Sequence, residues 1–286
     1  MQHGRRRSYC DEFFTREEKA KIAVLPVPYD RTSTWTKGAD KGPFCLLEAF
    51  DSLETYDIET QSDVSSRGIF VAEPAGKEEE PGKMVKEVEK RVSSLLSSGK
   101  FVVTVGGEHS VSVGAMKAHD SFYGGISILQ LDAHADLRDE YEGTPFSHAC
   151  VMARAGEHSP CIQVGVRSMS GEEKVKKGGR IFFAHDIAGS KEWFREVCGG
   201  LSDKVYVTID LDVLDPSIMP ATGTPQPGGL DWYTVLGLLR EVARSREVVG
   251  FDIVELCPIE GFRAPEVLAA KLLYKFLGYI YLGHRE

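Results

Sequence analysis

Histidines and aspartates recur in three short segments of the chain, and their side chains are of the types that bind metal ions or move protons. These candidate ligands are His109, Asp132, His134, Asp136, Asp210 and Asp212. In segments 132–136 and 210–212 the candidates occupy alternate positions. Alternate side chains of an extended chain share one side, so each of these two segments can direct its candidates at a single point.

Each segment on its own is a weak signal. Two aspartates separated by one residue often form a polar edge or cap a helix, and a histidine in a glycine-rich turn, such as that at 106–110, is more often structural. However, each segment directly follows a short apolar run, at 101–105, 126–131 and 205–209. Three such clusters after three predicted strands indicate a shared site.

Four carboxylates gathered at one place raise each other's pKa and destabilise the fold unless cations neutralise them. One divalent ion cannot readily use four carboxylates and two imidazoles, whereas two adjacent ions that share bridging carboxylates can. Mixed oxygen and nitrogen ligands suit Mn²⁺ better than a thiolate-preferring metal, and no cysteine lies in these segments. Two ions about 3.5–4 Å apart can hold and deprotonate one water molecule, which predicts a hydroxide nucleophile at neutral pH.

The elements that must position these residues are short β-branched runs that alternate with longer helical patterns. We predict strands at 22–27, 68–72, 101–105, 126–131, 161–166, 181–184, 205–211 and 248–254. We predict helices at 83–97, 111–118, 193–198, 232–245 and 265–281, and a loop at 73–82. Several strands are continuous apolar runs, which is typical of a parallel sheet covered by helices on both faces. In such open sheets, sites form at the carboxyl ends of the strands, where all three clusters lie.

These patterns predict a single α/β domain over residues 1–286, with a parallel sheet of about eight strands. The length of 286 residues would also allow two domains, but the motifs run from the first third to the last quarter of the chain and converge on one site. The predicted helix at 265–281 is apolar on nearly every side. We expect it to be buried or to lie in a subunit interface.

Composition argues against several classes of protein. The formal charge of −9 opposes a general nucleic-acid binder. No stretch reaches the roughly 18 apolar residues of a membrane-spanning helix, and no apolar region follows the basic residues 5–7 as a secretory signal would need. The six cysteines are scattered, at Cys10, Cys45, Cys150, Cys161, Cys198 and Cys257. We therefore expect reduced thiols and a cytoplasmic protein without nucleic-acid or membrane partners.

Five segments of the chain resemble the ureohydrolase family, which includes arginases and agmatinases. They are GADKGPFCLLEA at 38–49, GGEHS at 106–110, DAHADLRDEYEGTPFSH at 132–148, TIDLDVLDPSIMPATGTPQPGG at 208–229 and DIVELCP at 252–258. The resemblance implies a three-layer α/β/α fold around a parallel eight-stranded sheet. It also implies two Mn²⁺ ions per subunit and a homo-oligomer, either a trimer or a hexamer.

The resemblance also implies a role for each site residue. Asp132 and Asp210 would bridge the two ions. His109 and Asp136 would complete the coordination of one ion, and His134 and Asp212 would complete that of the other. Catalytic roles are implied for His148, Glu255 and Asp136: Glu255 would bind the substrate guanidinium, and His148 at the entrance would shuttle protons. Thr224 would help to shape the substrate region.

The implied reaction is hydrolysis of a guanidino group by the metal-bridging hydroxide, and the loop at 137–148 bears on its substrate. The arginase Ser-Gly-Asn pattern is missing from this loop, which is more similar to that of agmatinases. Its acidic residues Asp139, Glu140 and Glu142 suit a cationic tail, although they could equally form a solvated loop. We therefore expect agmatine as the substrate, giving putrescine and urea. N1-aminopropylagmatine (giving spermidine and urea) and arginine stay as alternatives.

One residue departs from the family pattern. Glu108 stands where the family usually has aspartate, and we expect it to orient His109 or the surroundings of the first metal.

Interpretations from other functional classes are weaker. A two-metal phosphoesterase would use Arg138 and Arg167, but the acidic loop opposes a phosphate substrate. A catalytically inactive binding protein would be expected to have lost ligands, and all six are present. The other histidines show no partner pattern and are expected to be structural or exposed: His3, His119, His158, His185 and His284.

Overall fold

A parallel sheet of eight strands forms the centre of the computed structural model, which describes residues 14–175 and 179–282. The strands are β1 (Ile22–Val27), β2 (Ile69–Val71), β3 (Phe101–Gly106), β4 (Ser127–Leu131), β5 (Cys161–Val166), β6 (Arg180–Phe183), β7 (Lys204–Asp210) and β8 (Glu247–Val254). Their order in the sheet is β2-β1-β3-β8-β7-β4-β5-β6, and every neighbouring pair is parallel. All eight predicted strands are confirmed, with ends that differ from the prediction by no more than one residue.

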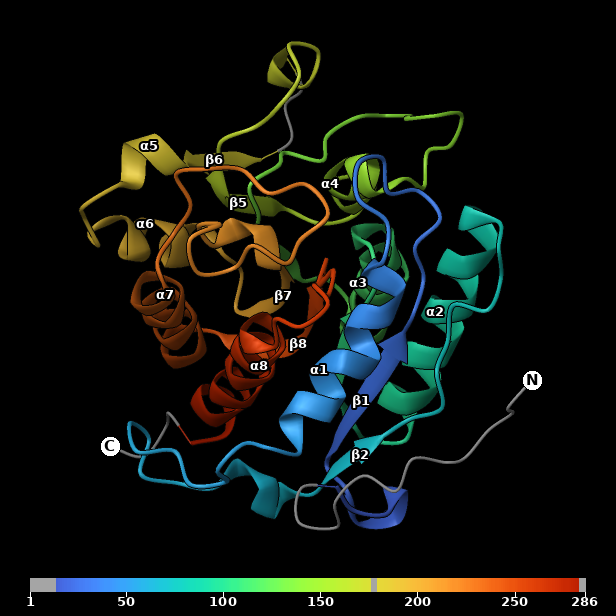
Figure 1. Cartoon of the computed structure of the whole chain (residues 1–286), viewed down its shortest axis with the longest axis vertical. Coiled ribbons are helices and arrows are strands. Elements are labelled where there is room, and N and C mark those ends of the chain that lie inside the picture. The colour runs from blue at the N-terminus through green and yellow to red at the C-terminus, as the bar shows by residue number, and fades with distance from the viewer. Residues whose placement is uncertain (1–13, 176–178, 283–286) are drawn as a thin grey trace.

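Helices cover both faces of the sheet, as the continuous apolar strands predict (Figure 1). The helices are α1 (Gly42–Phe50), α2 (Pro81–Ser97), α3 (Ser112–Tyr123), α4 (Val151–Ala155), α5 (Ala184–Ile187), α6 (Trp193–Gly200), α7 (Trp232–Ser245) and α8 (Ala264–Leu282). Residues of α1, α6, α7 and α8 form one apolar core, and residues of α2, α3 and α4 form the other. The predicted three-layer α/β/α architecture is therefore confirmed.

Alternate residues of each strand enter opposite cores. On β1, Ile22 and Val24 face the core of α1 and α8, whereas Ala23 and Leu25 face the core of α2 and α3. All four side chains are 0–1% exposed. Because both faces are buried, β1 needs no polar positions, and this explains its uninterrupted apolar sequence.

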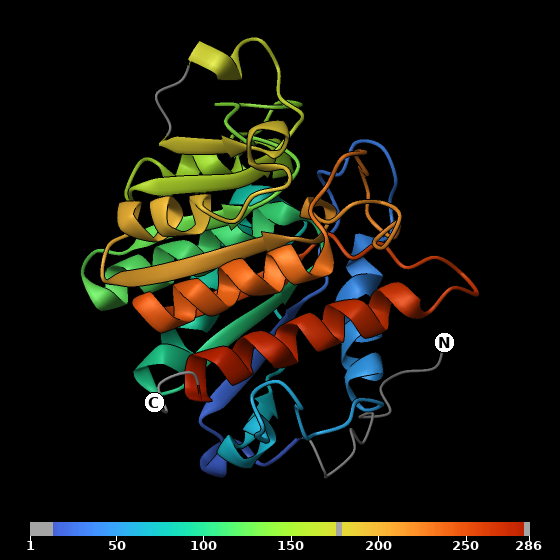
Figure 2. The same ribbon diagram turned by 90° about the vertical axis from the view of Figure 1, so that its left-hand side faces the viewer.

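Helix α8 is buried within this chain, which agrees with the first of the two readings of its apolar sequence. It lies beside α7 across one face of the sheet (Figure 2). Leu272, Leu273, Phe276 and Leu277 are fully buried among residues of α1, α7 and the strands. Burial inside the chain is therefore enough to account for the apolar character of this helix.

Three helices were not predicted from the sequence. Helices α4 and α5 span only five and four residues, which is too short for a helical period to emerge. Helix α1 buries six of its nine residues, so its apolar residues fill more than one stripe. The predicted helices are confirmed, and α3 continues to Tyr123 beyond its predicted end.

None of the described helices combines the length and apolar character needed to cross a membrane. Cys161, Cys198 and Cys257 are free thiols, as expected. Residues 5–7, His3, Cys10 and His284 lie outside the described residues, so their expected roles stay predictions.

His119 is a buried structural histidine. The sequence predicts that it is either structural or exposed, and the first of these is correct. Its Nδ1 lies 2.8 Å from the Ala115 carbonyl oxygen, and its ring centroid lies 4.7 Å from that of Tyr206. Nε2 has no hydrogen-bond partner among the described groups. Burial lowers the pKa of His119 to about 4, so the imidazole is neutral in the folded protein at neutral pH.

Acidification from pH 7 to pH 4.5 is therefore expected to destabilise the fold through His119. In the unfolded chain this residue titrates near pH 6.5, so between pH 6.5 and 4 the unfolded state binds a proton that the folded state does not. The free energy of unfolding then falls as the pH falls, by up to about 3 kcal/mol from this group. Chemical denaturation at both pH values measures the loss. The variant His119→Leu should lose less stability over this range, and equal losses in the two proteins would contradict the prediction.

Candidate metal centre

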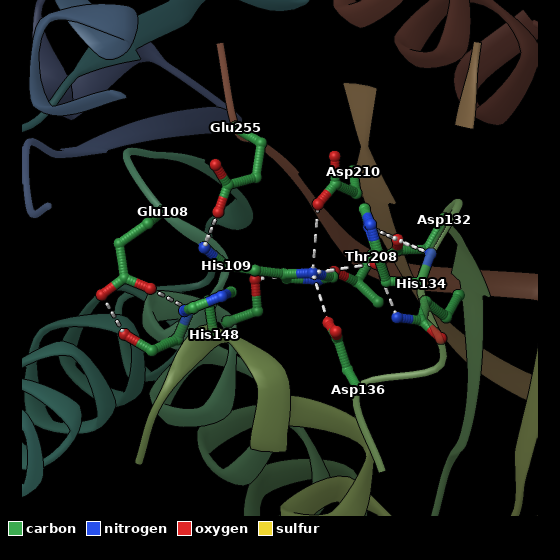
Figure 3. Close-up of polar contacts among 12 residues, drawn as sticks. Glu108, His109, Asp132, His134, Asp136, His148, Thr208, Asp210 and Glu255 are labelled. Carbon is green, nitrogen blue, oxygen red and sulfur yellow. Dashed lines mark hydrogen bonds and ion pairs between the residues drawn. The ribbon is translucent and has the colours of Figure 1, made fainter. Parts of the chain in front are cut away.

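Four adjacent strands of the sheet bring the candidate residues to one edge. In sheet order these strands are β3, β8, β7 and β4. His109 follows β3 and Glu255 follows β8, while Asp210 ends β7 and Asp132 follows β4. Figure 3 shows these side chains turned toward one another. The predicted position at the carboxyl ends of parallel strands is thus the observed one.

Local backbone features direct these side chains inward. Gly107 packs so closely on the segment that follows β1 that a Cβ there would lie 2.1 Å from the Tyr29 carbonyl oxygen. The Asp210 carboxylate accepts the Asp212 N–H at 2.8 Å and opens a 3₁₀ turn. Asp136 and Glu255 have left-handed backbone angles, with φ of 51° and 66°. Such angles are costly for residues other than glycine and concentrate at functional sites.

His109 is at the centre of the first cluster of candidate ligands. Its Nδ1 lies 3.1 Å from Asp132 Oδ2, 3.1 Å from Asp136 Oδ2 and 3.5 Å from Asp210 Oδ2. This nitrogen is fully buried, yet no described group completes hydrogen-bond geometry with it. An imidazole nitrogen without a hydrogen bond that faces three carboxylates has the chemistry of a divalent metal site.

The second cluster shares Asp132 with the first. His134 Nδ1 lies 2.9 Å from Asp212 Oδ2 and 3.6 Å from Asp132 Oδ1. Asp132 therefore presents one carboxylate oxygen to His109 and the other to His134. This arrangement would allow Asp132 to bridge two neighbouring ions. Asp210 Oδ2 lies 3.5 Å from His109 Nδ1. The bridging roles of Asp132 and Asp210 both stay predictions.

The carboxylates of the cluster repel one another when they are ionised, so a nearby positive charge would stabilise them. Burial and the charge of Asp132 raise the pKa of Asp136 to about 7, and burial and the charge of Asp212 raise the pKa of Asp210 well above its ordinary value. Burial opposes ionisation of Asp132 too, but the close approach of the His109 and His134 rings holds its pKa below the ordinary value. Divalent cations would relieve the repulsion between these carboxylates.

A buried chain of hydrogen bonds supports His109 from behind. Its Nε2 lies 2.9 Å from Thr208 Oγ1, and the Thr208 hydroxyl donates to Asp252 at 2.6 Å. Tyr206 donates to the other oxygen of Asp252 at 2.7 Å. Because the Thr208 proton is used by Asp252, Thr208 accepts from Nε2–H, which leaves the Nδ1 lone pair toward the carboxylates. Sequence reasoning gave Thr208, Asp252 and Tyr206 no role.

A cavity of about 320 Å³ opens onto the cluster. His109, His134, Asp136 and Asp210 form part of its wall. Glu255 also lines it: Oε1 accepts the His109 N–H at 2.8 Å, and burial and the Glu108 charge raise the pKa of Glu255 well above its ordinary value. A cationic ligand that reached Glu255 would stabilise its ionised form.

The Arginase family model matches residues 20–278 of the chain. The chain belongs to the arginase family. It is 37% identical over 280 residues to the N(1)-aminopropylagmatine ureohydrolase of Synechocystis sp., covering 94% of this chain and 92% of that protein. It is 41% identical over 272 residues to the protein of the same name from Thermus thermophilus, covering 92% of each. The crystal structure of the agmatine ureohydrolase of Thermoplasma volcanium has a TM-score of 0.88 at 31% identity and covers 96% of both chains.

As a member of this family, the protein is a ureohydrolase, an enzyme that acts on a guanidino group. The fold, the family and the presence of metal-ligand clusters agree with the sequence prediction. The three remaining predicted site residues, His148, Thr224 and Glu255, all line the cavity above the clusters. Asp132 and Asp212 lie beneath it and are 0% and 2% exposed.

His148 of the ureohydrolase is neutral at neutral pH. Burial lowers its pKa to about 4. A neutral imidazole can accept a proton at one nitrogen and donate one at the other. The expected role of His148 as a proton shuttle stays a prediction.

Glu108 lies beside the turn that carries His109. Its carboxylate accepts from the backbone and hydroxyl of Ser110, at 3.1 and 2.8 Å, and so caps the 3₁₀ turn that begins at His109. Its expected influence on the surroundings of the first metal stays a prediction. Arg167 is not available to a phosphate, because its guanidinium donates to backbone carbonyls such as those of Asp212 at 2.6 Å and Gln226 at 2.8 Å.

The acidic loop of the ureohydrolase behaves as a solvated loop. Asp139, Glu140 and Glu142 are exposed, and Asp139 lies 3.8 Å from Arg154. Arg138 and Tyr141 of this loop line the cavity. The guanidinium carbon of Arg138 lies 4.6 Å from the centre of the Tyr141 ring. The cavity wall also contains an acid that sequence reasoning missed. It is Glu173, whose oxygens accept the N–H groups of Leu137 at 2.9 Å and Ser170 at 2.6 Å.

Proposed function

We propose that this ureohydrolase hydrolyses N1-aminopropylagmatine to spermidine and urea, and that it acts on agmatine more slowly. The main support for this choice of substrate comes from two relatives that are named for it. They are 37% and 41% identical to this protein over more than nine-tenths of each chain. The agmatine ureohydrolase structure is 31% identical. This reverses the preference that the loop at 137–148 suggested, because the acids of that loop do not line the cavity.

Glu255 is the group that would hold the guanidinium. A carboxylate can accept two parallel N–H bonds from this planar cation. Its Oε2 faces the turn at Gly223, where an added Cβ would lie 3.4 Å away. The guanidinium carbon would then lie between Glu255 and the two clusters of ligands. Thr224, which follows Gly223 in the chain, lines the same wall.

We propose two Mn²⁺ ions as the cofactor, held by His109, Asp136 and Asp210 on one side and by His134 and Asp212 on the other, with Asp132 between them. The mixed carboxylate and imidazole donors fit this metal. When bound, the ions lower the pKa of a water molecule and so supply the nucleophile at neutral pH. His148, neutral and at the cavity wall, would carry a proton to the amine that leaves.

Glu173 supplies a further negative charge for the tail of the substrate. Its side chain is buried in the wall of the same cavity, and backbone N–H groups fix both oxygens. The guanidinium already has Glu255 as its partner. A second buried carboxylate therefore favours a substrate with at least one more positive charge, which an aminopropyl extension provides.

A panel of guanidines tests the proposed function. Protein loaded with Mn²⁺ is incubated with N1-aminopropylagmatine, agmatine or arginine, and urea and the released amine are both measured. We expect kcat/KM for N1-aminopropylagmatine to exceed that for agmatine by about 10-fold, equivalent to about 1.4 kcal/mol. Preference for arginine would overturn the choice of substrate. Failure to release urea from any of the three would overturn the proposed reaction.

The variant Glu255→Gln is expected to keep its metal and to lose guanidinium binding. Removing the charge weakens a charge-assisted pair, so KM should rise and kcat/KM should fall by about 100-fold. Steady-state kinetics together with metal analysis measure both effects. Wild-type kinetics in this variant would place the substrate site elsewhere in the cavity.

We further propose a single catalytic domain that assembles as a homo-oligomer, a trimer or a hexamer, in the cytoplasm, with a small cationic guanidine as its ligand. The family resemblance supports the assembly, and the free cysteines support the compartment. Light scattering on the purified protein measures the subunit number.

A further inference from the structure

Gln130 on β4 and Gln163 on β5 are buried polar residues in the middle of the sheet. The two strands are neighbours, and these residues are register partners. Both side chains are 0% exposed, and the residues on either side of each glutamine are apolar. Burying an amide is costly unless its polar atoms are hydrogen-bonded, so the partners of these two side chains decide what they contribute.

One backbone carbonyl fixes the direction of both amides. The Ala135 carbonyl oxygen lies 2.7 Å from one end of the Gln163 amide, and a carbonyl oxygen only accepts, so this end is the nitrogen Nε2. The same nitrogen lies 2.5 Å from the Gln130 amide, which therefore turns its oxygen toward Gln163. The Gln130 nitrogen is left on the other side, where it donates to Asp132 Oδ2 at 2.7 Å.

Asp132 thus receives one N–H on each of its carboxylate oxygens. Gln130 donates to Oδ2, and the backbone N–H of His134 donates to Oδ1 at 2.6 Å. The ring nitrogen Nδ1 of His109 lies 3.1 Å from Oδ2, and that of His134 lies 3.6 Å from Oδ1. Each carboxylate oxygen has two lone pairs, so one lone pair stays available beside each cluster of candidate ligands.

The Asp132 carboxylate cannot rotate without losing both donors. It is 0% exposed, so water does not replace them freely. Neither Gln130 nor Gln163 is part of the cavity wall. A contribution of the two glutamines to the reaction must therefore pass through Asp132 and the segment that carries it.

We propose that Gln130, oriented by Gln163, is a positioning residue that holds the Asp132 carboxylate with one oxygen toward each metal ion. This inference rests on the proposed pair of Mn²⁺ ions. Gln163 also holds the segment itself, because its amide donates to the Ala135 carbonyl, which lies between the candidate ligands His134 and Asp136. This role accounts for two buried amides among apolar neighbours.

The first test is Gln130→Met, which replaces the amide by an apolar group of similar length. Metal-free protein is titrated with Mn²⁺ by isothermal calorimetry. We expect the dissociation constants of both ions to rise by at least about 10-fold, because both ions would share Asp132. Gln61→Met makes the same change on an exposed residue and should keep the wild-type affinities. Wild-type affinities in Gln130→Met would overturn the inference.

A double variant separates positioning from stability. Gln130→Met leaves one N–H of Gln163 without its acceptor, and a buried unpaired donor lowers stability by itself. Gln130→Met/Gln163→Met removes that amide together with its unpaired Oε1, although it also removes the bond to the Ala135 carbonyl. The melting temperature of the metal-free double variant should therefore match or exceed that of the single variant.

The Mn²⁺ affinities of the double variant decide between the two roles. We expect them to stay at least about 10-fold weaker than in the wild type, because no amide orients Asp132. Affinities that return to the wild-type values in the double variant would show that Gln130 serves only the packing of the sheet, and would overturn the inference.

Failure of the proposed function gives a different result. If the wild-type protein binds two Mn²⁺ ions but releases no urea from any guanidine, the proposed reaction is wrong, and the titrations still decide the role of Gln130. If the wild-type protein binds fewer than two ions, the proposed metal pair is wrong, and the inference about Gln130 fails with it.

Discussion

Replacing Asp132 by asparagine is expected to abolish urea release and to lower the bound metal below one ion per chain. Asp132 is fully buried and is the one carboxylate shared by both clusters of candidate ligands among the described residues. Asparagine offers a single neutral oxygen, so neither ion keeps its shared anionic ligand. We expect kcat/KM to fall by more than about 1,000-fold, equivalent to about 4 kcal/mol.

Metal analysis and a urea assay on the same sample measure both losses. Asp139→Asn is the matched control, because it makes the same change on an exposed residue outside the cavity wall. We expect this control to keep its metal and to stay within about 2-fold of wild-type activity. Full metal content and activity in Asp132→Asn would show that the shared carboxylate does not bridge two ions.

Gly250→Ala is expected to produce the largest loss of stability. Gly250 lies on β8, paired with Val102 of β3 and Tyr206 of β7, in the middle of the sheet. An added Cβ would lie 2.1 Å from Nε2 of His119, a ring that is fully buried and packed against Tyr206. Neither the strand nor the ring can move away without disturbing its neighbours, so we expect a loss of about 3 kcal/mol.

A double variant identifies the cause of this loss. His119→Ala removes the ring and leaves a cavity, which is destabilising by itself. In the double variant the new methyl group enters that space, so its free energy of unfolding should exceed the value expected from adding the two single losses. Denaturation curves for the four proteins give this coupling. Wild-type stability in Gly250→Ala, or strictly additive losses, would contradict the predicted collision.

The sheet and the metal clusters could be predicted because their signals are local in the sequence. β1 is a continuous apolar run of six residues, and β5 and β7 are short segments rich in β-branched residues. These patterns can be read from the sequence without knowing which elements lie next to them. Asp132, His134 and Asp136 occupy alternate positions directly after β4, so their spacing indicates that they lie near one another. The left-handed backbone at Asp136, which places it beside His109, could not be read from that spacing.

Residues that act through long-range contacts could not be found in this way. Thr32 meets His148 across 116 positions, and Glu173 meets Leu137 across 36. No period or spacing in the sequence encodes such pairs, because loop conformations decide them. The acidic loop at 137–148 was a poor guide to the substrate for the same reason. The sequence contains the charges of this loop, but it does not show whether they face the cavity or the solvent.

The position of β8 in the sheet has a consequence for the order in which the enzyme matures during synthesis. β8 follows every other strand in the chain, yet it lies between β3 and β7 in the sheet. Until it inserts, β2-β1-β3 and β7-β4-β5-β6 are two separate halves, with His109 on one and Asp132 on the other. The ribosome must therefore release nearly the whole polypeptide before the ligands can meet. Parallel pairing over such sequence distances is slow, so capture of metal is expected to be a late, post-translational event.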